Sequence, residues 1–181
     1  MAIYSYALSS SQVLTHYLTA TNRAPTFSSN PFAAAGTIAG QLYAATLATN
    51  ASDPNGDTIT FAKVSGPAWL SVAGNGSLGG TPLSADVGTN GFVVSATDPG
   101  GLSSTATMNL TVIAAPPIVL NAVLLGNALM LNWAGGIAPY QVQLNPDLTG
   151  STWQNLGGII GANNLLVPLT NGAAFYRVYG Q

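Results

Sequence analysis

The chain has 181 residues, of which three are Lys or Arg, five are Asp and one is His, and Glu and Cys are absent. Charged residues make up only 4% of it, against roughly a quarter in an ordinary soluble domain. This composition removes most of the side chains that acid–base, nucleophilic and metal chemistry require, so we expect no enzyme and no catalytic residue. A net charge of −2 gives no basis for nucleic-acid binding, and no apolar run approaches the roughly 20 residues of a membrane span.

The first part of the chain is the only one with a helical pattern. Ser9 is a candidate cap, and Val13, Leu14 and Tyr17 follow at helix-like spacing. We therefore predict a short helix from Ser9 to Tyr17.

The rest of the sequence has the period-two alternation of short β-strands. The alternating segments are 58–63, 92–97, 105–112, 129–133, 140–144 and 175–179. Turn signals that contain Gly, Asn, Asp or Pro separate them. The clearest are Asp53-Pro-Asn-Gly, Asn75-Gly76, Asn90-Gly91, Asp98-Pro-Gly-Gly, Asn145-Pro-Asp and Asn171-Gly172. Many short strands at this spacing predict an all-β fold built from sandwiches.

Two proline-bearing segments divide the chain. Ala114-Ala-Pro-Pro117 follows a strong strand, and Thr21-Asn-Arg-Ala-Pro25 follows the predicted helix. We predict an N-terminal stub at 1–22, a β-sandwich at 23–115 and a second, smaller β-sandwich at 116–181. The last segment is small for an independent sandwich, so we expect it to pack against a neighbour or another chain.

The central segment carries five short motifs in a recognisable order. They are Ala24-Pro-Thr-Phe27, Asp53-Pro-Asn-Gly-Asp57, Gly66-Pro-Ala-Trp-Leu-Ser71, Gly76-Ser-Leu-Gly-Gly-Thr-Pro82 and Ala96-Thr-Asp-Pro-Gly-Gly101. Over these residues the chain resembles the Ig-like domains of the dystroglycan-type cadherin-like group. The resemblance implies a non-catalytic Ig-like β-sandwich.

The two flanking segments carry weaker resemblances. Leu131-Asn-Trp133, Tyr140-Gln-Val142, Trp153 and the closing 175–178 segment look like the fibronectin-III-like ending of large bacterial surface proteins. Residues 2–20 look like the tail of a laminin-G or concanavalin-like lectin domain, and this resemblance implies a strand that begins at Ile3 and runs into the short helix. Together these resemblances imply the C-terminal end of a multi-domain bacterial protein that is secreted or lies at the cell surface.

Two loops hold the candidate metal ligands. Asp53, Asn55 and Asp57 alternate in one loop, and Asp98 lies in another that can meet it at the same end of a sandwich. Calcium takes six to eight oxygen ligands, and such a loop supplies several of them, so a calcium site is one hypothesis. The alternative is an ordinary turn in which the Asp side chains bind their own backbone. The junction at Asn22-Arg23 also departs from cadherins, because it places a cation where they have acidic or amide ligands.

Aromatic side chains provide the candidate sugar-binding residues, because sugars stack on aromatic rings. Trp69 and Trp133 fit core positions, which leaves Trp153 as the best exposed candidate and Tyr140 as the next.

Two functions of different classes follow from the sequence. The first is a structural or adhesive module of a secreted or surface protein, which assembles into an extracellular filament through β-strand contacts. Its partners would be other domains of a larger parent protein or copies of itself, because few charges protect its strand edges. The second is a carbohydrate-binding accessory module, dependent on calcium as its only candidate cofactor and with polysaccharide as its partner.

Overall fold

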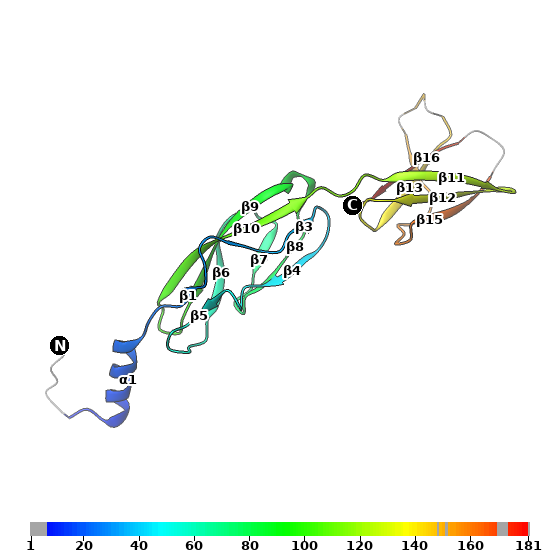
Figure 1. Cartoon of the computed structure of the whole chain (residues 1–181). Helices are drawn as coiled ribbons and strands as arrows, with labels where there is room; N and C mark the ends of the chain where they lie inside the picture. Colours follow the sequence, from blue (N-terminus) through cyan, green and yellow to red (C-terminus); the bar gives the residue numbers. More distant parts are fainter. Residues whose placement is uncertain (1–6, 148, 151, 170–173, 181) are drawn as a thin grey trace.

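The computed structural model describes residues 7–147, 149–150, 152–169 and 174–180. One helix precedes a long series of short strands, as Figure 1 shows. The all-β prediction, with a short helix at the N-terminal end, is confirmed. Most of the strand expected near Ile3 lies outside the described residues. No helix in the described part of the chain is long and apolar enough to cross a membrane.

The helix α1 (Ser10–Thr21) begins at a capped serine. Ser9 Oγ accepts a hydrogen bond from the Gln12 amide at 3.3 Å, and Gln12 Oε1 accepts one from the Ser9 amide at 2.9 Å. This reciprocal capping box satisfies two backbone donors that have no partner inside the helix. The predicted start of the helix is therefore correct, and the helix continues past Tyr17. The Tyr17 side chain is 64% exposed, so the apolar side of α1 faces solvent.

Ten short strands build the first β-sandwich. They are β1 (Thr26–Phe27), β2 (Phe32–Ala33), β3 (Thr37–Ile38), β4 (Tyr43–Thr46), β5 (Ala51–Ser52), β6 (Thr60–Ser65), β7 (Leu70–Val72), β8 (Ser77–Gly80), β9 (Gly88–Thr97) and β10 (Ser103–Ile113). One sheet has the order β2-β10-β9-β6, with β3 also paired to β10. The opposing sheet has the order β4-β8-β7, and β1 pairs with β5. A short 3-10 helix, η1 (Ser84–Asp86), precedes β9.

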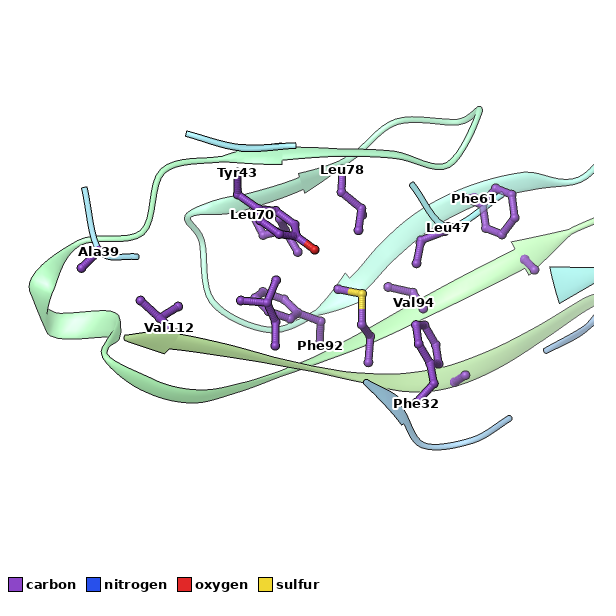
Figure 2. Packing of buried hydrophobic residues seen from close by; sticks show 14 residues of the cluster. Phe32, Ala39, Tyr43, Leu47, Phe61, Leu70, Leu78, Phe92, Val94 and Val112 are labelled. Atoms are coloured by element: carbon purple, nitrogen blue, oxygen red, sulfur yellow. The ribbon is translucent and has the colours of Figure 1, made fainter. Parts of the chain in front are cut away.

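The core of this sandwich lies between the two sheets. Strict alternation on β9 and β10 directs every second side chain inward, so Phe92, Val94 and Met108 are each 0% exposed. Tyr43, Leu70 and Leu78 from the opposing sheet face them, as Figure 2 shows, and belong to the same cluster. The alternation predicted from the sequence is confirmed for both strands.

A tight turn joins β7 to β8, as the Asn75-Gly76 signal predicts. Gly76 has φ of +86°, a conformation that side chains with a Cβ rarely adopt. Asn75 Oδ1 accepts a hydrogen bond from the Ser77 amide at 3.0 Å, which closes the turn.

Within the described residues, six strands form the C-terminal unit. They are β11 (Val119–Leu125), β12 (Ala128–Ala134), β13 (Tyr140–Asn145), β14 (Gln154–Asn155), β15 (Asn164–Pro168) and β16 (Phe175–Gly180). Two three-stranded antiparallel sheets result, with the orders β11-β12-β15 and β14-β13-β16. Their inner faces share a small core of Leu131, Trp133, Tyr140, Val142 and Val167.

The predicted linker Ala114-Ala-Pro-Pro117 falls between β10 and β11 and contains no strand. It is bonded to the C-terminal unit, since the Gly136 amide donates to the Pro116 carbonyl at 2.7 Å. The boundaries at residues 22 and 115 themselves stay a prediction.

Candidate functional site

Asp53 organises the loop between β5 and β6. Its Oδ1 accepts hydrogen bonds from the amides of Asn55 at 2.7 Å and Asp57 at 3.1 Å. This is the local side-chain-to-backbone bonding of an Asx turn. Asp53 Oδ2 is also buried, and it has no hydrogen-bond partner within the described residues.

Asp98 organises the loop between β9 and β10 and is only 5% exposed. Its Oδ1 accepts a hydrogen bond from the Leu102 amide at 2.9 Å, which holds the loop closed. Its Oδ2 accepts one from the side-chain amide of Asn22 at 2.8 Å. Both carboxylate oxygens of this buried side chain are therefore satisfied by the chain itself.

The segment that leaves α1 is held between these two loops. The Arg23 amide donates to Asn55 Oδ1 at 2.9 Å, and Asn55 Nδ2 donates to the Thr21 carbonyl at 3.3 Å. With the Asn22–Asp98 bond, these contacts tie residues 21–23 to the end of the sandwich. We call the Asn22, Asn55 and Asp98 side chains the entry clasp.

A groove of about 530 Å³ lies beside the entry clasp. Its lining includes Thr19, Asn22, Asn55, Asp57, Pro99, Gly100 and Leu102. The structure thus brings the two predicted loops to one end of the sandwich and adds Asn22, which sequence reasoning treated as part of a linker. The sequence signal for Asn22 was its place in the Asn-Arg-Ala-Pro junction just before β1, because a side-chain amide at that point can form a hydrogen bond to a neighbouring loop. Calcium binding by the four predicted residues stays a prediction.

Tyr140 and Trp153 lie in different surroundings. Tyr140 is 5% exposed, its ring centroid lies 5.5 Å from that of Trp133, and its hydroxyl donates to the Gly135 carbonyl at 3.0 Å. Tyr140 is therefore a core residue here, because a sugar cannot reach a ring that the two sheets cover. Trp153 is half-buried, and the Arg177 guanidinium carbon lies 4.3 Å from its ring centroid. One face of the Trp153 ring is thus already occupied.

Two exposed aromatic rings near Trp153 were missed by sequence reasoning. Phe175 is 40% exposed and Tyr179 is 47% exposed, and both lie on β16. The signal was the alternation of Phe175, Arg177 and Tyr179, which marks them as one face of the strand. Sequence alone left open whether this face meets the core or solvent. The structure shows that Tyr176 and Val178 pack on the core instead.

Other charged side chains also form hydrogen bonds to nearby backbone groups, as Asp53 and Asp98 do. Lys63 Nζ donates to the carbonyls of Pro67 at 2.9 Å and Leu70 at 2.7 Å. Asp86 Oδ2 accepts the Leu83 amide at 2.8 Å. Asp147 has a pKa below its usual value, because the Thr149 hydroxyl and then the Thr149 amide donate to its carboxylate. Within the described residues, no group of three or more His, Cys, Asp or Glu side chains that could hold a metal ion is assembled.

Comparison with known proteins identifies one part of the chain. The bacterial Ig domain family matches residues 22–111. No curated protein matches the chain.

Among solved structures, the endo-fucoidan hydrolase MfFcnA4 from glycoside hydrolase family 107 aligns with a TM-score of 0.51 and 20% identity, covering 89% of this chain and 29% of that one. A second such hydrolase, MfFcnA9, has 33% identity and a TM-score of 0.44 over 49% of this chain and 15% of its own. The human desmocollin-1 ectodomain aligns with 16% identity and a TM-score of 0.39, over 89% of this chain and 37% of its own.

The chain spans less than a third of either hydrolase, and the likeness to MfFcnA4 shows the fold alone. The dystroglycan-type and fibronectin-III-like assignments stay predictions. The family match, the sheet order and the core together show that residues 22–111 form an Ig-like domain.

Proposed function

We propose that this chain is a non-catalytic structural module of a bacterial secreted or cell-surface protein. The Ig-like domain and the C-terminal unit would act as consecutive β-sandwich spacers, with boundaries at residues 22 and 115. Two three-stranded sheets around one core support a fibronectin-III-like assignment for the second spacer. A bacterial Ig domain supports the extracellular location.

One observation carries this proposal: three of the side chains capable of acid–base chemistry are bonded to the chain's own turns and loops. Asp53, Asp98 and Lys63 each bind two backbone or amide groups, as described above. A general acid or base needs a group that reaches a substrate proton, and these groups are committed to loop geometry. Their role is to stabilise the fold.

A product-release assay tests the non-catalytic part of the proposal. The full chain is incubated with a panel of neutral and acidic polysaccharides, and new reducing ends are measured against a buffer blank. We expect no release above the blank for any polymer. Release that persists after repurification and disappears in a variant such as Asp57→Asn would contradict the proposal.

We further propose that the module assembles with copies of itself through the free edge of β11. This strand pairs with β12 on one side, and no other described strand pairs with it. Its residues carry no charge, and Val119, Val123 and Leu124 are 66%, 43% and 64% exposed. An uncharged exposed edge is a template for pairing with another strand. Antiparallel pairing of β11 with its copy would extend the sheet across two molecules.

Light scattering over a concentration series, with electron microscopy at the highest concentration, tests the assembly. We expect the molar mass to rise with concentration in the unchanged chain. Val123→Lys should keep the chain monomeric, because a charge on the edge opposes strand addition. Leu42→Lys, at a side chain 78% exposed in the Ig-like domain, is the matched control and should assemble normally. A monomer at all concentrations would refute assembly and leave the spacer role standing.

Calcium at Asp53, Asn55, Asp57 and Asp98 is tested by the melting temperature in calcium and in EDTA. The buried, unpartnered Asp53 Oδ2 favours a cation, whereas the hydrogen bonds already made by Asn55 and Asp98 oppose one. A calcium-dependent rise that Asp57→Asn abolishes would support the site. Identical melting curves in the two buffers would remove it.

A further inference from the structure

The outer face of the β14-β13-β16 sheet combines exposed aromatic rings with ordered polar groups. Tyr140 and Val142 of β13 point into the core, so Gln141 and Gln143 lie on the opposite face, where neighbouring groups leave them only 6% and 9% exposed. Pairing places Gln143 opposite Arg177, and Gln141 opposite Tyr179. We call this surface the outer sheet face.

A hydrogen-bonded ladder crosses the three strands at the middle of this face. Gln143 Nε2 donates to Asn155 Oδ1 at 2.7 Å, and Arg177 Nε donates to Gln143 Oε1 at 2.8 Å. The Arg177 guanidinium also lies over the Trp153 ring. These contacts restrict the rotamers of long polar side chains that would otherwise lose entropy on binding a ligand.

Phe175 and Tyr179 flank Arg177 on the same strand and face. Four residues of a strand span about 13 Å, so a ligand that covers both rings must be elongated. The exposed positions of β10 hold Ser103, Thr105, Thr111 and Ile113, and none of them is aromatic. A solvent-facing strand of this chain can therefore do without aromatic rings, so the two exposed rings of β16 are not required for folding alone.

We propose that the outer sheet face binds a neutral polysaccharide. A sugar ring has an apolar C–H face that stacks on an aromatic ring, and hydroxyl groups that exchange hydrogen bonds with amides and guanidinium groups. Phe175 and Tyr179 supply the stacking, and the exposed Arg177 guanidinium, which Gln143 holds in place, supplies the polar contacts. This site goes beyond the spacer role, and either can fail without the other.

The charge of the chain favours a neutral polysaccharide over other elongated ligands. Nucleic acid needs several cations, and Arg177 is the only Lys or Arg within residues 116–181. The chain as a whole carries −2, which opposes an acidic polymer at low salt. A polymer of neutral sugars meets neither obstacle.

Native gels that contain soluble polysaccharide test the proposal with the full chain. The probes are a neutral β-glucan, a neutral galactomannan and acidic alginate, and titration calorimetry follows for any polymer that retards the chain. We expect retardation by at least one neutral polymer. Tyr179→Ala and Phe175→Ala should each lower the association constant about tenfold, the effect of losing one ring contact.

Two further variants separate binding from folding. Tyr179→Phe keeps the ring and should retain most of the affinity. Tyr17→Ala removes a ring on α1 that is 64% exposed, against 47% for Tyr179, and should change nothing. All four variants should have the same melting temperature as the unchanged chain, because the rings that they alter are exposed. The proposal is overturned if no neutral polymer retards the chain, if a chain that carries both Phe175→Ala and Tyr179→Ala binds normally, or if only alginate binds.

Discussion

The two β-sandwiches of this chain are built from similar strands but bury very different amounts of apolar surface. In the Ig-like domain, fourteen buried hydrophobic residues form one cluster, and Phe92 packs edge-on against Trp69 at 5.6 Å between ring centroids. In the C-terminal unit the described residues contribute five. A small sandwich buries a lower fraction of its surface, so its stability rests more on polar contacts and on neighbours. Because the two cores differ so much in size, we expect the two units to unfold in separate transitions. A truncation in one core should shift the transition of that unit alone.

The largest expected effect comes from the larger core. Phe92→Ala removes a ring that is 0% exposed, and the cavity left behind should cost about 3–5 kcal/mol of unfolding free energy. Denaturant unfolding should show two transitions, of which only the one assigned to the Ig-like domain moves. A single transition that moves as a whole would mean that the two sandwiches unfold as one unit.

In the smaller core, even a Leu→Ala truncation should be enough to unfold the C-terminal unit, so that its unfolding transition disappears. Leu131→Ala removes a side chain that is 1% exposed and should cost about 2–4 kcal/mol, a large share of what such a small unit can hold. Near-ultraviolet circular dichroism of the tryptophans should show the C-terminal unit unfolded while Trp69 keeps its native signal. An unchanged C-terminal transition would show that a neighbour stabilises this unit.

The entry clasp belongs to the Ig-like domain, and its loss should lower the unfolding free energy less than the core truncations do. Asp98→Ala leaves the Leu102 amide and the Asn22 side chain without their acceptor, which should cost about 1–3 kcal/mol. Asp57→Asn changes an exposed carboxylate in the neighbouring loop and should cost little. Hydrogen exchange should show faster exchange of the Arg23 amide only in the first variant. Equal effects of the two changes would mean that the clasp does not hold the entering segment.

The smallest effect concerns a buried hydroxyl in the larger core. Tyr43 Oη has no hydrogen-bond partner among the described residues, and burial raises the pKa of Tyr43 above its usual value. Its neutral form is favoured in the fold, so the stability that depends on it is present below about pH 10 and declines as the pH rises above that value. Tyr43→Phe should leave stability at neutral pH unchanged or raise it by up to about 1 kcal/mol. It should also flatten the alkaline decline, which melting curves from pH 8 to 11 would reveal.

Much of the fold could be predicted from sequence because alternation is a local signal. The inward faces of β9 and β10 follow from Phe92, Val94 and Met108, and the turn at Gly76 follows from the need for positive φ. The order of strands in each sheet could not be predicted, because it depends on pairing between distant segments. The short strands β1, β2 and β3 are such a case, because β1 pairs with β5 whereas β2 and β3 both pair with β10.

The candidate site residues show the same difference between what local sequence predicts and what depends on distant packing. Asp53 was assigned to a turn by its neighbours in sequence, and its local hydrogen bonds agree with the turn interpretation. Tyr140 and Tyr179 could not be told apart, because both are aromatic residues in alternating strands. Only the packing of the two sheets decides which ring is 5% exposed and which is 47% exposed.

The single lysine has a practical consequence for studying this protein. Lys63 follows the alternation of β6, and its ammonium group is held by two backbone carbonyls beside a bulge at Val64. A reagent that acylates neutral amines should therefore react slowly with it while the Ig-like domain is closed, and fast once the domain opens. Because the chain contains no other lysine, mass spectrometry of one modified peptide would time the opening of that domain without any introduced label.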